Sequence, residues 1–166
     1  MNDAQIQWSL THYDSITADD LYEALALRQR VFVVEQRCAF LDADGLDRFS
    51  WHLLGRRRAA AEHGKGTLVA YLRIVPPGRK FAEPSIGRVI TAPEVRGQGY
   101  GRLLMQEGIR RTRELFPDRA IKLSAQRYLE RFYGSFGFTV AGEPYDEDGI
   151  PHVNMVMARK GAASSR

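Results

Sequence analysis

The segment that most constrains this chain is a glycine-rich turn, Arg96-Gly97-Gln98-Gly99-Tyr100-Gly101, which joins a strand-like stretch to an amphipathic helical pattern that ends near Phe116. The first N–H groups of a helix have no partner within the helix and lie at the positive end of its dipole, so they favour an anion. Gly99 and Gly101 lack a Cβ atom, so a phosphate could approach the backbone closely, and Arg96 would add a charge-assisted donor. The turn therefore indicates either an ordinary tight connection or a pyrophosphate site.

The spacing of the glycines excludes two common nucleotide sites. The chain has no G-x-x-x-x-G-K-[ST] run, which a P-loop requires. It has no G-x-G-x-x-G run either, and Gly97, Gly99 and Gly101 have the wrong spacing for a dinucleotide fold. A phosphate site at this turn would therefore be of another kind.

Length and composition favour one globular domain. The 166 residues are 44% hydrophobic and 27% charged, and we expect one domain over residues 1–160 with a frayed tail over residues 161–166. No apolar run reaches the length of a membrane span, and the first residues do not resemble a secretory signal, so we expect a cytoplasmic protein without a membrane partner. The one cysteine, Cys38, excludes an internal disulfide and gives no metal cluster, so no metal is expected.

The net charge of +4 does not indicate a nucleic-acid partner. Arg110, Arg111 and Arg113 are interspersed with two glutamates, as on a solvated helix face. The arginines lack the interleaved aromatic residues that a base-stacking surface needs. We therefore expect no nucleic-acid partner.

The order of predicted elements is that of a mixed α/β (α+β) chain. Thr17 is placed to cap a first helix, because Asp20 follows three residues later, and Gly137 is placed to end the last one. Helical spacing predicts helices up to Val31, from the glycine turn to Phe116, and over residues 129–136. Strands are predicted at residues 6–10, 51–54, 68–75, 86–91, 121–124, 138–141 and 153–158.

Two motifs resemble one enzyme family. Arg96-x-x-Gly99-x-Gly101 is similar to the (Q/R)-x-x-G-x-(G/A) pyrophosphate loop of the GNAT superfamily of N-acetyltransferases, and Phe132–Phe138 resembles its FY-x-x-x-GF region. Further matching runs indicate the ElaA-like branch and span nearly the whole chain: 31–36, 42–47, 86–89, 132–138 and 147–152. The resemblance implies a GNAT-type acyl-CoA N-acyltransferase fold. Its central, mostly antiparallel, twisted sheet would be flanked by helices and splayed between its fourth and fifth strands, where acetyl-CoA enters.

The resemblance also implies an activity, the transfer of acetyl from acetyl-CoA to a primary amine by direct attack in a ternary complex. The acceptor would be a small-molecule or peptide amine, and a homodimer is left open. The residues that the resemblance assigns to acetyl-CoA are Val89, Ile90, Arg96, Gly97, Gln98, Gly99, Tyr100, Gly101, Arg102, Gln126 and Tyr133. The backbone N–H of Val89 would polarise the thioester carbonyl. Gln126 stands where the family often has an asparagine that contacts the pantetheine arm; it keeps the amide on a longer side chain.

Tyr133 has two interpretations. Its spacing with Leu129 and Phe132 places it on an apolar helix stripe, which by itself favours core packing. The resemblance instead assigns it as the acid that protonates the departing thiolate, a role that a phenol can fill because it stays protonated at neutral pH.

The group that removes the proton from the amine is less determined. Many GNAT enzymes place a glutamate on the fourth strand, but the strand predicted there contains Arg88 and no carboxylate. The candidates elsewhere are Glu35, Asp44 and His52. A histidine has the intrinsic pKa for the task, although a lone histidine on an apolar strand is more often structural. The missing carboxylate favours the alternative function, a non-catalytic CoA-binding or sensing module.

Two acidic segments, residues 35–47 and 143–148, would flank the acceptor entrance in the family fold and attract a cationic amine. The run from Asp42 to Asp47 lacks the ligands of a calcium loop and predicts a turn with an acidic surface. Arg73 and Arg88 would either bind a carboxylate of the substrate or pair with buried acids of the protein. With Asp44 they form the predicted acceptor site, which an amine with a nearby carboxylate would suit.

Overall fold

The strands form one open sheet in a computed structural model that describes residues 6–58, 64–159 and 161. The strand order is β1-β2-β3-β4-β5-β8-β6, and β7 pairs with β8. The bounds of the strands are β1 (Ile6–His12), β2 (Trp51–Arg57), β3 (Thr67–Val75), β4 (Ser85–Thr91), β5 (Ile121–Gln126), β6 (Thr139–Val140), β7 (Tyr145–Glu147) and β8 (Ile150–Met157).

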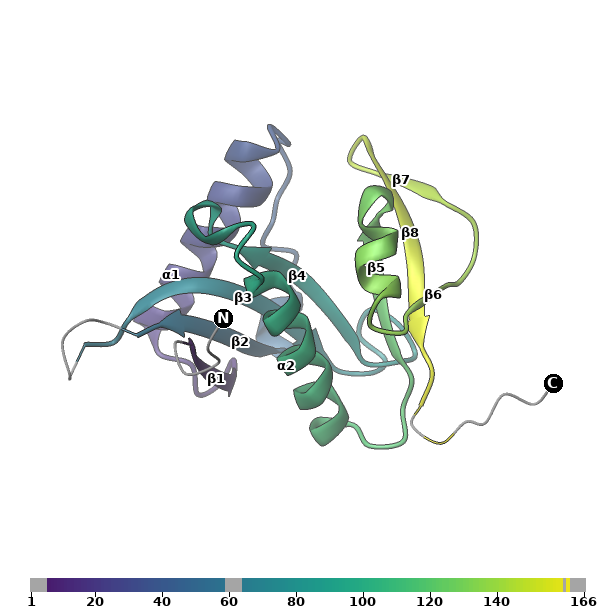
Figure 1. The fold of residues 1–166 in the computed structure, drawn as a ribbon, viewed down its shortest axis with the longest axis horizontal. Helices are drawn as coiled ribbons and strands as arrows, with labels where there is room; N and C mark the ends of the chain where they lie inside the picture. The colour runs from purple at the N-terminus through teal and green to yellow at the C-terminus, as the bar shows by residue number, and fades with distance from the viewer. Residues whose placement is uncertain (1–5, 59–63, 160, 162–166) are drawn as a thin grey trace.

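The sheet is splayed between β4 and β5. These two strands are parallel and are in register at one pair, Ser85 with Lys122, whereas the other neighbouring strands are antiparallel. Figure 1 shows β4 and β5 close together at the lower end and apart at the upper end. The predicted mostly antiparallel sheet with a splay at this point is confirmed.

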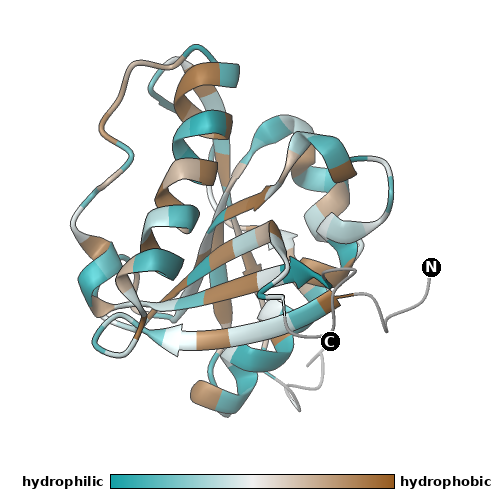
Figure 2. Ribbon diagram, turned by 90° about the vertical axis from the view of Figure 1, so that its left-hand side faces the viewer, coloured by the Kyte–Doolittle hydropathy of each residue, from teal (hydrophilic) through white to brown (hydrophobic). Residues whose placement is uncertain are grey.

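Helices cover both faces of the sheet. The bounds are α1 (Ala18–Arg28), α2 (Tyr100–Leu115) and α3 (Glu130–Gly134). The predicted cap of α1 is confirmed, because the Thr17 hydroxyl accepts a hydrogen bond from the Asp20 N–H at 3.1 Å. The chain continues beyond α1 as a π-helical segment, Gln29–Glu35. Figure 2 shows polar and apolar turns alternating along the helices, with apolar segments in the strands between them.

The two layers have separate cores. Leu104 and Met105 of α2 pack with Leu72 and neighbouring strand residues on one face, and Ala24 and Leu27 of α1 pack on the other. α2 lies so close to the sheet that a Cβ atom on Gly108 would come within 2.4 Å of the Leu72 side chain. The glycine at this position therefore permits the close approach.

The C-terminal part differs from the sequence prediction. The last helix is shorter than predicted at both ends: Leu129 belongs to a 3₁₀ turn, residues 127–129, and α3 ends at Gly134. The strand predicted at residues 138–141 covers only Thr139–Val140. β7 was not predicted, since its sequence Tyr-Asp-Glu does not alternate clearly between apolar and polar residues. A two-residue turn, Asp148-Gly149, joins β7 to β8, and both residues have positive φ values of 54° and 79°. This is the type I′ turn that Asp-Gly favours in hairpins.

None of the described helices is long and apolar enough to cross a membrane. The predicted frayed tail, residues 161–166, lies outside the described residues apart from Gly161.

Candidate active site

A cavity of about 410 Å³ lies in the splay between β4 and β5. One wall comes from β4 and the π-helical segment, and the other comes from β5, α3 and the β7–β8 hairpin. The predicted site residues that line it are Glu35, Arg73, Arg88, Val89, Ile90, Arg96, Gly101, Gln126 and Tyr133. The fold thus brings together residues from distant parts of the chain that the sequence indicated separately.

The glycine turn lies at the start of α2 and presents open backbone. Gly97 and Gly99 have φ values of 72° and 83°, a conformation that favours glycine. A Cβ atom on Gly97 would meet nothing within 4 Å. Among the described residues, the N–H groups of Gly97, Gly99 and Gly101 donate to no backbone carbonyl. These donors fit an anionic group, since an unpaired N–H at a helix start favours negative charge.

The side chains of the turn have different surroundings. Arg96 forms a two-point ion pair with Glu35, with N–O distances of 2.6 and 3.0 Å. The Tyr100 side chain is buried in the core, so only its backbone can serve a ligand. Gln98 donates to the Glu94 carbonyl at 3.2 Å. Arg102 donates to the Ser135 hydroxyl at 3.3 Å and lies over the Phe136 ring.

A β-bulge lies at the centre of β4. Tyr71 is opposite Ile90 and Arg73 is opposite Gly87, so both Arg88 and Val89 face the single residue Leu72 of β3. Arg88 has a φ of 53°, an uncommon value for a residue other than glycine. A bulge leaves its extra residue unpaired and bends the strand, so backbone groups of the bulge are available to the cavity that Arg88 and Val89 line.

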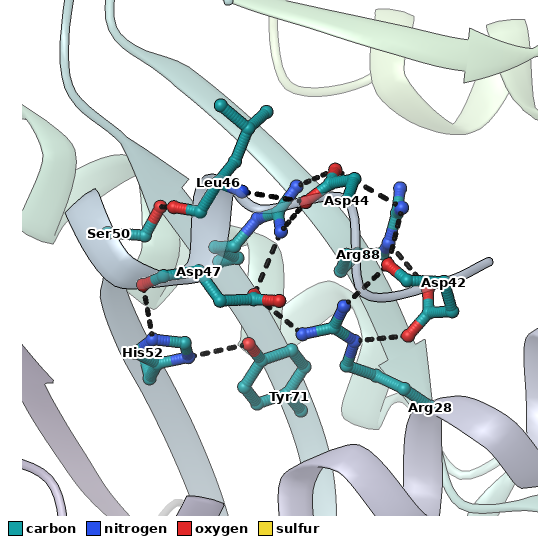
Figure 3. Close-up of polar contacts among 10 residues, drawn as sticks. Arg28, Asp42, Asp44, Leu46, Asp47, Ser50, His52, Tyr71 and Arg88 are labelled. Atoms are coloured by element: carbon teal, nitrogen blue, oxygen red, sulfur yellow. Dashed lines mark hydrogen bonds and ion pairs between the residues drawn. The ribbon is translucent and has the colours of Figure 1, made fainter. Parts of the chain in front are cut away.

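Three arginines and three aspartates form an ion network next to this bulge (Figure 3), in which Arg28, Arg73, Asp42 and Asp47 are buried. Arg28 lies 2.7 Å from both Asp42 and Asp47. Arg73 contacts both carboxylate oxygens of Asp44 at 2.7 Å and Asp47 at 2.8 Å. The Arg88 guanidinium is 2.7 Å from Asp42 and 3.3 Å from Asp44. The formal charges of the six side chains cancel.

The network changes the interpretation of the acidic run. Asp42 and Asp47 are 6% and 8% exposed, so the prediction of an acidic surface is wrong at these two positions. Burial alone would raise the pKa of Asp47, but hydrogen bonds and charges from Arg28 and Arg73 outweigh it and lower that pKa. Arg73 and Arg88 thus pair with acids of the protein, which is the second of the two alternatives left open for them. Asp44 is held on Arg73 and is not part of the cavity lining.

His52 lies outside the cavity lining and is fully buried on β2. Its Nε2 is 3.2 Å from the Asp47 carbonyl, which can only accept, so Nε2 carries the proton. Nδ1 then accepts from the Tyr71 hydroxyl at 2.8 Å. Burial lowers the pKa of His52, which keeps the ring neutral. With both nitrogens occupied, the ring fits a structural role, and it is not brought to the predicted site.

Tyr133 has both features that the sequence suggested. Its ring packs against Phe132 and Phe138, with centroids 5.2 and 6.4 Å apart, and it also lines the cavity. Burial raises the pKa of Tyr133, so its hydroxyl stays protonated at neutral pH. On the same side of the cavity, the Gln126 amide reaches across the splay and donates to the Gln36 side chain at 3.3 Å.

The second wall contains a polar group of which the sequence indicated only the acidic segment 143–148, without Ser124 or His152. Ser124, Glu147 and His152 line the cavity, and Tyr145 adjoins them. They come together because β8 pairs with both β5 and β7. The Asp148-Gly149 turn is the signal that could have shown this, since it fixes Tyr145 opposite His152.

Comparisons with known proteins agree with this architecture. The sequence model described as Acetyltransferase (GNAT) domain matches residues 56–159. A UPF0039 protein of Synechocystis is 45% identical over 92% of this chain and 95% of its own length, and the ElaA protein of Escherichia coli is 39% identical over 90% and 95%. The crystal structure of an acyl-CoA N-acyltransferase from Pseudomonas aeruginosa superposes with a TM-score of 0.84, at 39% identity over 92% of this chain and 99% of that one. The E. coli ElaA crystal structure gives 0.81, at 38% identity over the same shares.

Proposed function

The chain belongs to the GNAT acetyltransferase family, in its ElaA-like branch, and from this premise we propose that it transfers acetyl from acetyl-CoA to a primary amine by direct attack in a ternary complex. The observation that carries the proposal is the shared cavity. It is lined by residues of the glycine turn, by the bulge of β4 and by Tyr133. Anion binding, carbonyl polarisation and leaving-group protonation can therefore act on one bound molecule.

The glycine turn would hold the pyrophosphate of CoA. The open N–H groups of Gly97, Gly99 and Gly101 supply donors without side-chain obstruction at Gly97. Tyr100 contributes its backbone, while Arg96, Gln98 and Arg102 lie around the turn. Arg96 can serve the phosphates only by sharing or leaving its contact with Glu35.

The splayed edge of β4 would bind the pantetheine arm, because an exposed strand edge offers main-chain donors and acceptors to amides. Ile90 and Gln126 line this part of the cavity on opposite walls. The N–H of Val89, in the bulge, would polarise the thioester carbonyl.

Tyr133 would protonate the departing thiolate. Tyr133 lines the cavity with its ring packed into the core, and its raised pKa keeps the hydroxyl protonated at neutral pH. No group of three or more potential metal ligands is found among the described residues, and the proposed steps use none. The expected cytoplasmic location and a small-molecule or peptide acceptor are parts of the same proposal.

One observation favours the second candidate, a CoA-binding module without catalysis: β4 carries no carboxylate that could act as a base. Two measurements separate the candidates. Calorimetric titration with CoA tests the turn, and release of CoA from acetyl-CoA in the presence of primary amines, with products identified by mass spectrometry, tests transfer. Binding without any acetylated product would favour the module, and absence of CoA binding would overturn both.

A further inference from the structure

We propose that the polar group on the second cavity wall is the acceptor site, in which Glu147 binds the ammonium form of a primary amine and His152 removes its proton. The inference rests on the proposed function, because it supplies the base that β4 lacks. It assigns a role to the hairpin β7–β8, which the mechanism above leaves unused.

The position of these side chains follows from strand alternation. On β5, Leu123 and Ala125 are buried in the core beneath α2 and α3, so Ser124 faces the opposite side of the sheet. On β8, Val153 belongs to the same core, so His152 faces the same side as Ser124. The wall is therefore built on three paired strands, with Tyr145 of β7 in register with His152.

Among the residues that the structure describes, His152 has a hydrogen-bond partner at one ring nitrogen, and the other is available for chemistry. Nδ1 is 2.8 Å from the Ile150 carbonyl, which can only accept, so the neutral ring has its proton on Nδ1. Nε2 then carries the lone pair, and the side chain lines the cavity. The Tyr145 ring stacks on the imidazole, with centroids 6.0 Å apart and an angle of 27°, and fixes its orientation. His52, by contrast, has both nitrogens occupied.

Glu147 is oriented for a cation. Its Oε2 lies 3.3 Å from the Ser124 hydroxyl and 3.4 Å from the Tyr145 hydroxyl. These two hydroxyls also hydrogen-bond to each other, so one of them donates to the other and the second donates to Glu147. Among the described residues it has no arginine or lysine within ion-pair distance, whereas Glu35 in the same cavity is bound to Arg96. Lys80 lines the same cavity and feels the charge of Glu147 more than that of any other group, but the two form no ion pair. A carboxylate that is oriented and has no contact ion pair favours an ammonium group. The other titratable or charged groups that line the cavity with His152 are Glu35, Lys80, Arg96, Tyr128 and Tyr133, together with the neutralised Arg73 and Arg88.

His152 and Tyr133 account for both protons that the ammonium group loses during acetyl transfer. One proton of the ammonium passes to His152 Nε2 and then to solvent. The neutral amine forms the C–N bond at the thioester carbonyl, the C–S bond breaks, and the thiolate takes a proton from Tyr133. The second proton lost by the nitrogen restores Tyr133. The net change is an amide, CoA thiol and one released proton.

The test compares His152→Gln with His12→Gln, a matched change on β1 outside the cavity lining. Acetylation of n-propylamine, glycinamide and spermidine is followed by CoA release, and products are identified by mass spectrometry. With the best of these probes we expect kcat/KM of His152→Gln to fall by roughly 10²-fold or more below that of His12→Gln at about pH 7. The deficit should shrink toward about pH 9, because more of the amine is then already neutral.

A second variant tests whether Glu147 binds the ammonium group of the acceptor. Glu147→Gln should raise KM for the probe amine by about tenfold, on the scale of one lost charge contact, and leave CoA affinity unchanged in calorimetry. If His152→Gln stays within about threefold of His12→Gln, or if its deficit does not change with pH, the inference is wrong while the proposed function stands. If the wild type acetylates none of the probes, the proposed function itself fails. Circular dichroism melting of each variant excludes loss of fold as the cause.

Discussion

The two walls of the cavity use the same kinds of side chain in opposite ways. Behind the β4 wall, Arg28, Arg73 and Arg88 are matched by three aspartates in a closed network. On the β5–β8 wall, Glu147 and His152 are oriented by neutral hydroxyl and carbonyl groups and line the cavity. A charged residue close to a site is thus structural when its partners neutralise its charge, and is free for ligand chemistry when they only orient it.

The ion network next to β4 has a structural role. Arg88 takes an uncommon positive φ in the bulge, and such a conformation persists only where its surroundings impose it. Its guanidinium is held by Asp42 and Asp44, and these are fixed in turn by Arg28 and Arg73. The network therefore holds the backbone of the bulge, which includes Val89, in position.

The largest expected effect comes from opening this network. Asp47→Asn would leave Arg28 and Arg73, which are almost fully buried, without one of their counter-charges. We expect the free energy of unfolding to fall by about 3–5 kcal/mol, as for a broken buried ion pair. Urea unfolding measures it. The matched control is Glu114→Gln, an exposed acid on α2, which should cost about 0.5 kcal/mol or less.

The same wall should be sensitive to acid. The pKa values of Asp44 and Asp47 are lowered, so their contribution to stability is complete above the ordinary aspartate pKa of about 4 and is lost as pH falls through their folded values. Asp47→Asn should flatten the decline in stability below about pH 4. A cost of Asp47→Asn no larger than that of Glu114→Gln would show that the aspartate is not part of a saturated structure.

The second-largest expected effect comes from Tyr133 of α3, which lines the cavity. Tyr133→Phe keeps the ring between Phe132 and Phe138 and removes only the hydroxyl. We expect kcat to fall by roughly 10²-fold, in the range of acid catalysis, with little change in CoA affinity. Steady-state turnover and calorimetry give the two values, and Tyr22→Phe on the exposed face of α1 is the control. Unchanged turnover, with chemistry shown to limit the rate, would leave Tyr133 as a packing residue alone.

The third effect tests the anion site. Gly101→Glu would place a negative charge beside the turn, and its Cβ would lie 3.8 Å from the Phe132 ring. We expect CoA affinity to fall by about tenfold or more, on the scale of one charge-assisted contact. Gly134→Glu is the control, since a Cβ there meets nothing within 4 Å and the residue lies outside the cavity lining. Equal CoA affinity in the two folded variants would show that the phosphates of CoA do not bind at this turn.

The comparison of the walls also explains what the sequence could predict. The glycine turn and the Phe132–Phe138 segment are local patterns, so their positions in the fold could be predicted from spacing and resemblance. The state of Asp44 and His52 could not be predicted, because it depends on partners 5 to 44 residues away in the sequence that the fold brings together. The β7 strand was not predicted, because its three residues, all polar or aromatic, are too few to show the alternation of apolar and polar residues that marks a strand. The Asp148-Gly149 turn nevertheless indicates a hairpin at this point.

The smallest expected effect is that of Glu35→Gln, which tests whether Glu35 is a paired structural residue or a reacting group. Glu35 lines the cavity and was a candidate base. Both of its carboxylate oxygens lie within 3.0 Å of Arg96, so its charge is paired with an arginine, as the charges of the aspartates are. Glu35→Gln should therefore change kcat by less than about threefold, since the pair is half exposed and its energy is small.

Affinity for CoA should rise slightly in the Glu35→Gln variant, because Arg96 no longer has to leave a carboxylate in order to meet the phosphates. Calorimetric titration of CoA and steady-state turnover of the same preparation measure the two quantities, and Glu114→Gln again serves as the control for a lost surface charge. A fall in kcat of roughly 10²-fold, the effect expected for loss of a general base, would instead place Glu35 among the reacting groups and remove that role from His152.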